Sequence, residues 1–146
     1  MTDNLLFIIT LIIILINIII AHLFAPMGMI LSPFVISITS ILLVMLTNNV
    51  NPIKLIFLIL SLLLLNDIGM FFFAGGTLDK VGFGLQNLVL LINFILSELI
   101  IILAYFIKYK DSSIKVRINS ILISILIFII YLAIKSFVGQ YFIIEY

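Results

Sequence analysis

The chain has 146 residues, of which 66% are hydrophobic and only 9% are charged, and its mean hydropathy is +1.53. Soluble domains are about 45–50% apolar and about 25% charged, so this chain lacks the polar residues that a water-exposed surface requires. The net charge of +1 comes without a basic patch, which argues against a nucleic-acid partner. We therefore expect an integral membrane protein that partners the lipid bilayer.

The first two apolar segments are expected at residues 5–24 and 30–47. About 20 apolar residues cross the hydrocarbon core as a helix, so residues 5–24 suffice for one span. A cleaved signal peptide would need basic residues before its apolar run, whereas Asp3 and no Lys or Arg precede this one. Residues 30–47 form the shortest and most polar segment, for which a re-entrant or interfacial segment is the alternative to a short span.

Three further apolar segments are expected at residues 52–73, 85–107 and 116–137. Pro52 suits the first turn of a helix, because the N–H that proline lacks would be unpaired there anyway. The glycine-rich residues 75–84 are expected to form a flexible hairpin loop. We predict an all-α fold, a polytopic helical membrane protein with five transmembrane helices in one compact bundle. Residues 1–146 then form a single transmembrane domain without a soluble domain.

The positions of Lys and Arg predict how the segments are threaded, because short cytoplasmic loops are enriched in these residues. With five spans, the N-terminus and the connections near residues 50 and 112 share one side. Five basic residues lie on that side and two on the other, namely Lys54, Lys108, Lys110, Lys115 and Arg117 against Lys80 and Lys135. We expect the N-terminus and loop 108–117 in the cytoplasm and the C-terminus outside. The membrane is expected to be a bacterial inner membrane, with an organellar inner membrane as the alternative.

The third segment carries a carboxylate, Asp67, about six residues from the outer end of its helix and thus roughly 9 Å below it. A charged side chain at mid-bilayer costs at least about 2.5–3.5 kcal/mol on insertion scales, and such residues usually face protein or water. The threading places His22, Gln86 or Asn87, and Lys135 at the same depth. We expect Lys135 or a protonated His22 to pair with Asp67 in a mainly structural role, with a relay station as the alternative.

The fourth segment carries Glu98 about ten residues from Lys108, roughly 15 Å into the membrane and close to its midplane. No basic residue is expected at this depth, and the expected neighbours are Asn17 and Ser124. Burial without an opposite charge disfavours the ionised form, so we expect Glu98 to be protonated when its site is dry. Such a carboxyl is either a station of a proton or cation relay or a neutral clasp between helices, and both interpretations stay open.

Small and polar side chains recur at helical spacing along four segments. The sets are Thr10, Asn17 and Ala21; Ser37, Ser40 and Thr47; Gln86, Asn93 and Ser97; and Ser120, Ser124, Tyr131 and Lys135. Membrane helices associate through small residues and interhelical hydrogen bonds, so we expect these stripes to face the interior of the bundle. The alternative is a stripe that lines a solute path. The residues expected to support Glu98 and Asp67 are His22, Asn17, Asn87, Asn93, Ser124 and Lys135.

Residues suited to metal or covalent chemistry are scarce. The chain contains no cysteine and one histidine, which leaves too few ligands for the usual zinc site. Residues 75–84 lack the order of a phosphate-binding loop. We therefore expect no catalytic residue, no metal and no cofactor.

Three functions are compatible with these features. The first is a small non-catalytic subunit or partner-binding component of a larger membrane complex, which binds other membrane proteins or copies of itself. The second is conduction of protons, cations or a small solute, as an oligomer or within a complex, with Glu98 and Asp67 as titrating stations. The third is an enzyme that acts on lipid, for which the sequence names no chemistry. We expect the first.

Overall fold

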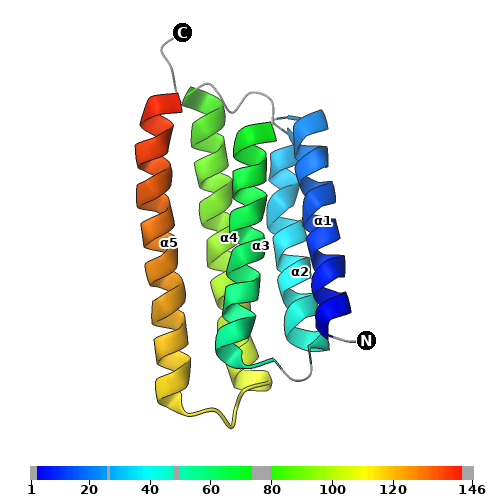
Figure 1. Ribbon diagram of the computed structural model, residues 1–146, viewed down its shortest axis with the longest axis vertical. Helices are drawn as coiled ribbons and strands as arrows, with labels where there is room; N and C mark the ends of the chain where they lie inside the picture. Colours follow the sequence, from blue (N-terminus) through cyan, green and yellow to red (C-terminus); the bar gives the residue numbers. More distant parts are fainter. Residues whose placement is uncertain (1–2, 26, 48–49, 74–79, 143–146) are drawn as a thin grey trace.

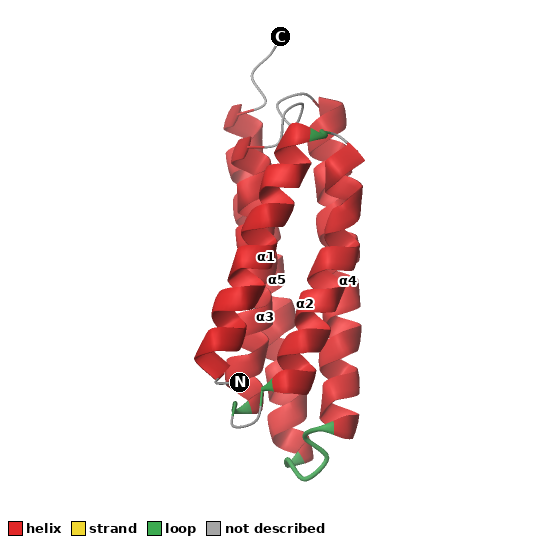
Figure 2. Cartoon of the chain, turned by 90° about the vertical axis from the view of Figure 1, so that its right-hand side faces the viewer, coloured by secondary structure: helices red, strands yellow, loops and turns green. Residues whose placement is uncertain are grey.

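The computed structural model describes residues 3–25, 27–47, 50–73 and 80–142, nearly all of them helical. Five long helices run along a common axis (Figures 1 and 2). Their bounds are α1 (Asp3–Leu23), α2 (Ser32–Leu46), α3 (Pro52–Phe73), α4 (Lys80–Ile107) and α5 (Ile114–Phe142), and the short 3-10 helix η1 (Met27–Leu31) precedes α2. Each of these helices is long and apolar enough to cross a membrane when α2 is counted together with η1. The predicted all-α bundle of five helices is confirmed.

The helices differ from the expected spans in three places. The expected second span begins at residue 30, but residues 30–31 belong to η1 and α2 begins at Ser32, because Pro33 cannot donate the backbone hydrogen bond that an earlier α-helical start would need. Helix α4 begins at Lys80, within the expected hairpin loop, whose residues 75–79 lie outside the described part of the chain. Glycine costs only about 1 kcal/mol in a helix, and the contact of Gln86 with α3 offsets that cost. Helix α5 continues beyond the expected end to Phe142.

The start of α3 shows how local sequence sets a helix boundary. The side-chain oxygen of Asn51 accepts a hydrogen bond from the backbone N–H of Ile53 at 3.0 Å, which satisfies a donor of the first turn. Pro52 occupies the first helical position, as the sequence predicted. One turn earlier in the chain, the Thr47 hydroxyl donates to the carbonyl of Leu43 and ends α2. Capping residues at both ends therefore define the connection between α2 and α3.

Helix α3 is the centre of the bundle and contacts all four other long helices. Of its apolar window 56% is buried, against 22% for α5. Helices α1, α2 and α4 surround α3, whereas α5 packs against α3 and α4, at the edge of the bundle (Figure 1). The central core consists mainly of aliphatic side chains of α3 with those of α1, α2 and α4. Apolar packing therefore fixes four helices well and α5 weakly.

One glycine permits a close backbone contact in this core. A Cβ atom at Gly28 in η1 would lie 2.6 Å from the carbonyl oxygen of Ile20 and 2.7 Å from the Cα atom of Ala21. Any side chain there would have to push η1 away from α1. The chain turns back tightly after α1 because this position lacks a side chain.

Candidate functional site

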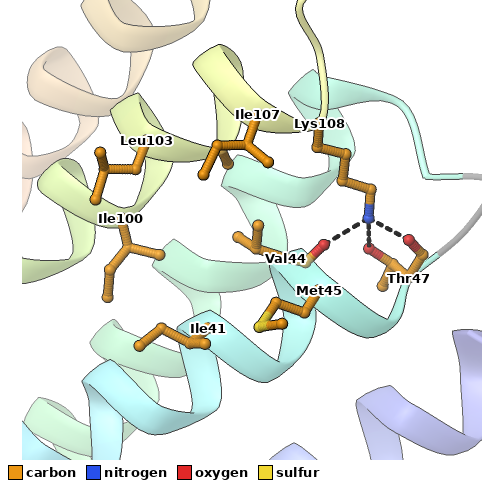
Figure 3. Close-up of a pocket in the computed structure, with 9 residues that line it drawn as sticks. Ile41, Val44, Met45, Thr47, Ile100, Leu103, Ile107 and Lys108 are labelled. Atoms are coloured by element: carbon orange, nitrogen blue, oxygen red, sulfur yellow. Dashed lines mark hydrogen bonds between the residues drawn. The ribbon is translucent and has the colours of Figure 1, made fainter.

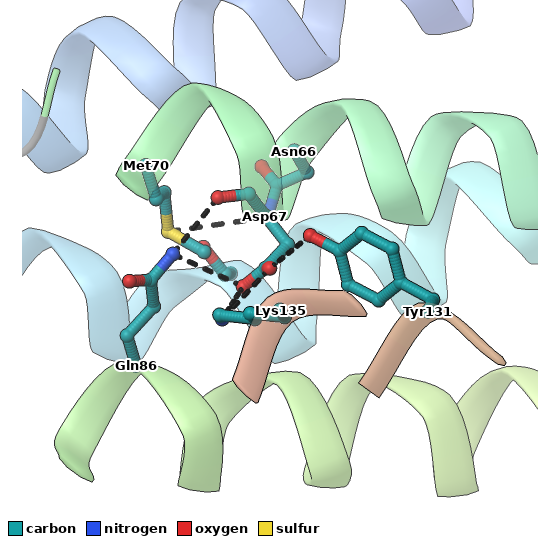
Figure 4. A network of polar contacts seen from close by, with 7 residues as sticks. Asn66, Asp67, Met70, Gln86, Tyr131 and Lys135 are labelled. Atoms are coloured by element: carbon teal, nitrogen blue, oxygen red, sulfur yellow. Dashed lines mark hydrogen bonds and ion pairs between the residues drawn. The ribbon is translucent and has the colours of Figure 1, made fainter. Parts of the chain in front are cut away.

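A buried ion pair joins α3 to α5 at the end of the bundle opposite the 108–113 connection. Lys135 Nζ lies 2.9 Å from Asp67 Oδ1 and 2.8 Å from Oδ2, and both residues are buried. The Tyr131 hydroxyl donates a hydrogen bond to Oδ2 at 2.5 Å, and Gln86 Nε2 donates one to Oδ1 at 3.1 Å (Figure 4). Helices α3, α4 and α5 therefore meet at one carboxylate.

The partners of Asp67 neutralise its charge and occupy both of its oxygens. Each oxygen accepts from Lys135 and from one neutral donor, and Gln86 also donates to the backbone carbonyl of Asp67 at 2.8 Å. The ammonium of Lys135 lies 5.7 Å from the ring centroid of Phe83, within the range of a cation–π contact. Of the two basic partners considered from the sequence, Lys135 makes the pair. The arrangement suits a fixed structural link better than a site that binds and releases ions.

A recess of about 220 Å³ adjoins the ion pair between α3 and α5. Its lining is mostly aliphatic and aromatic, with Ile68, Phe71, Phe72 and Ile134 beside the flank of Tyr131 and Lys135. Asp67 itself remains fully buried behind this lining. The recess therefore offers an apolar ligand a place beside the pair but offers an ion no further polar ligand among its described residues.

A second polar cluster lies on the other side of α3. Asn17 Nδ2 on α1 donates to Ser32 Oγ at 2.8 Å and to Asn66 Oδ1 at 2.7 Å. Ser32 Oγ in turn contacts Met70 Sδ at 3.2 Å, and all four residues are buried (Asn66 and Met70 in Figure 4). This cluster joins α1, α2 and α3.

The neighbours Asn66 and Asp67 thus serve two different interfaces. Successive helical residues point about 100° apart, so one dipeptide reaches α1 on one side and α5 on the other. Asn66 was not among the predicted site residues, although an Asn–Asp pair inside an apolar helix was the available signal. Gln86 was predicted only as one of two residues at the depth of Asp67, and Tyr131 only as a member of a polar stripe.

Glu98 lies at the seam between α4 and α5 and is 9% exposed. Ser124 of α5 donates a hydrogen bond from Oγ to Glu98 Oε1. The other oxygen, Oε2, is buried and has no hydrogen-bond partner within the described ranges. Both carboxylates of the α3–α4 hairpin therefore contact the weakly packed helix α5.

An apolar layer separates the two carboxylates along this seam. The rings of Phe94 and Phe128 stack with centroids 3.6 Å apart and an interplanar angle of 1°. Leu63 of α3 and Leu90 of α4 are buried against the same layer. The seam thus has a polar part at Asp67, an apolar middle and a second polar part at Glu98.

Three expected neighbours of the carboxylates lie elsewhere. Asn17 does not accompany Glu98, because α1 packs against α2 and α3 and its amide is used in the second polar cluster. His22 is exposed and turned away from Asp67, since the neighbouring Ala21 occupies the buried face of α1. Asn87 is half-buried and the adjacent Gln86 takes the contact with Asp67. Asn93 is buried with its Oδ1 unpartnered in the described part of the chain.

At the 108–113 end, Lys108 ties α4 to the C-terminal end of α2. Its ammonium donates to the carbonyls of Val44 and Thr47 and to the Thr47 hydroxyl (Figure 3). A cation is favourable here because helix C-termini carry unpaired carbonyls and a partial negative charge. Burial lowers the pKa of Lys108, and nearby Asp3 opposes this change. Burial also raises the pKa of the adjacent Tyr109 to about 12.

No family model matches this chain, and neither a curated protein nor a solved structure is similar to it.

Proposed function

We propose that the chain is a non-catalytic component of a larger membrane assembly and packs against another membrane protein. The observation that carries this proposal is an outward-facing groove of about 500 Å³ between α2 and α4 (Figure 3). Ile41, Met45, Leu103 and Ile107 line it with exposed aliphatic side chains. Ala104 lies at its buried base. Small residues flanked by larger ones let another helix approach closely, as is typical of helix association in lipid.

The polar groups beside the described recesses support a non-catalytic role. Lys108 at the end of the α2–α4 groove is engaged with three acceptors, and Lys135 beside the smaller recess is paired with Asp67. A group of three or more potential metal ligands does not occur among the described residues. A nucleophile or acid–base catalyst would need a polar side chain with spare bonding capacity beside a cavity.

Conduction with Glu98 and Asp67 as two stations has weaker support from the geometry. Asp67 is held by three donors, and the stacked rings of Phe94 and Phe128 lie between it and Glu98. An ion or proton that passed from one carboxylate to the other would have to cross this apolar layer.

Site-directed photocrosslinking in membranes of the natural host tests the proposed assembly role. A photoreactive phenylalanine analogue replaces Met45 in the groove or, as the control, Ile129 on the exposed face of α5. We expect a protein adduct of fixed mass at Met45 and only lipid adducts at Ile129. Ala104→Phe fills the base of the groove and should remove the adduct.

The mass of the adduct identifies the partner class. A mass of two copies of this chain supports self-association, and any other fixed mass supports a different subunit. Lipid adducts alone at Met45, or the same protein adduct at Ile129, would overturn the proposal.

A further inference from the structure

The bonding of Glu98 indicates a second role that does not depend on the assembly role. Ser124 satisfies one carboxyl oxygen, whereas Oε2 is buried and unpartnered among the residues that the structure describes. An ionised oxygen buried without a partner costs far more than a neutral carboxylic acid in the same place. The geometry therefore favours the form of Glu98 that carries a proton.

Charged residues are widely spaced in sequence on the helices that pack around Glu98. Helix α2 contains none, the ones on α3 and α5 that come nearest in depth are Asp67, Arg117 and Lys135, and on the side of α4 towards its C-terminal end the next is Lys108, just beyond the helix. The titratable residue on the same face of α4 is Tyr105, two turns from Glu98 and buried. Protonation of Glu98 thus depends on contact with hydroxyl groups and with water from one end of the bundle.

Buried hydroxyl groups lead from Glu98 towards the 108–113 end. Ser120 precedes Ser124 by one turn on α5, and both are buried. The Tyr105 hydroxyl lies near that of Ser120 but makes no hydrogen bond of ordinary geometry within the described residues. Its ring contacts that of Tyr109, whose hydroxyl donates to the carbonyl of Val50 at the end of the bundle. Each hydroxyl can both donate and accept, as proton transfer along a file requires.

In the opposite direction, the stacked rings of Phe94 and Phe128 close the seam. The leucines and phenylalanines of this layer carry no polar side-chain group, and the hydroxyl of Tyr131 is bonded to Asp67 on its far side. A proton on Glu98 thus has a polar route to one end of the bundle and an apolar barrier towards the other.

We propose that Glu98 is a proton-binding site that exchanges its proton with the 108–113 face only, through the hydroxyls of Ser124, Ser120 and Tyr105. In the exchange, the carboxyl O–H bond breaks, the carboxylate remains and one proton enters water at that face. The reverse step restores the acid, and no other reactant is needed.

Infrared spectroscopy on proteoliposomes of one orientation tests this site. The band of the protonated carboxyl is followed while an impermeant buffer raises the pH on one face at a time. We expect a band that is absent in Glu98→Gln and present in Asp67→Asn, the matched control. It should decay when the pH rises at the 108–113 face and persist when the pH rises at the opposite face.

Two variants test the route and a third tests the apolar barrier. Tyr105→Phe removes one hydroxyl and should slow the decay by about tenfold or more, because a positioned acid–base group accelerates proton transfer. Ser120→Ala should also slow the decay. It serves as the test of the route if circular dichroism shows that Tyr105→Phe does not fold. Phe94→Ala should let the band respond to the opposite face.

Three results would overturn the proposal. The first is a wild-type band unchanged by Glu98→Gln, which would mean that Glu98 is ionised. The second is equal decay from both faces in the wild type. The third is an unchanged decay rate in folded variants of both Tyr105 and Ser120.

Discussion

The ion pair of Asp67 and Lys135 gives the sharpest test of the structure. Asp67→Asn leaves a buried ammonium without its counter-ion, and Lys135→Met leaves a buried carboxylate. The double variant removes both charges, while the amide that replaces the carboxylate can keep contacts with Tyr131 and Gln86. Lys54→Met at an exposed lysine is the matched control.

The expected magnitudes follow from the surroundings of each charge. Removing one partner of a buried ion pair costs about 3–5 kcal/mol, because the other charge stays buried. The cost of Lys135→Met should lie near the upper end of this range, since Asp67 is fully buried and keeps only the donors Tyr131 and Gln86. Asp67→Asn should cost about 3 kcal/mol, because a long lysine side chain can extend towards the membrane surface.

The free energy of unfolding is measured by circular dichroism in mixed micelles with increasing SDS. We expect the double variant within about 1–2 kcal/mol of the wild type, because replacing both charges of a buried pair is often neutral. Lys54→Met should change the free energy by less than about 0.5 kcal/mol. A double variant as unstable as the sum of the two single variants would refute the reasoning, as would single variants no worse than the control.

Four further predictions use other parts of the bundle. Gly28→Ala should cost about 1–3 kcal/mol in the same assay, because its Cβ would strike the α1 backbone. Gly84→Ala, which meets open space in a helix, should gain up to about 1 kcal/mol. Asn66→Ala removes a buried acceptor and should cost about 1–3 kcal/mol, with faster amide exchange in α1. The hydrogen bond from the Tyr109 hydroxyl to the carbonyl of Val50 should be fully present below the ordinary pKa of tyrosine and be lost as the pH rises through about 12, because the raised pKa keeps the hydroxyl protonated. The difference in tyrosinate absorbance between the wild type and Tyr109→Phe measures this titration.

The membrane class and the five-helix bundle could be predicted because each depends on composition summed over about 20 residues. A helix boundary depends on fewer residues. Pro52 marked the start of α3 correctly, since proline has one favourable helical position. The glycines before residue 85 suggested a loop, but α4 begins at Lys80, because tertiary contacts with α3 outweigh the modest cost of glycine.

Contacts between helices were harder to predict than the helices themselves. Depth alone placed Asp67 level with both His22 and Lys135, but which of the two pairs with Asp67 depends on how each helix is rotated about its axis. Similarly, depth placed Asn17 near Glu98, although α1 lies on the far side of α3. Hydropathy contains little information about rotation when a helix is apolar on all sides. In such a helix the polar residues alone fix the rotation, and they do so through side-chain pairs that only the packed structure reveals.

The burial of Lys135 also sharpens the argument about orientation. Lys135 was counted as a charge on the outer side, but its ammonium is neutralised by Asp67 inside the bundle, which leaves Lys80 alone against five basic residues. The cytoplasmic location of loop 108–117 stays a prediction from the positions of Lys and Arg. Because the chain has no cysteine, single introduced cysteines can report on which side of the membrane each loop lies. An impermeant maleimide should label Asp79→Cys in intact cells and Asp111→Cys only after the membrane is opened, and Lys135→Met should not change this pattern. Labelling of Asp111→Cys in intact cells would show that the opposite orientation holds.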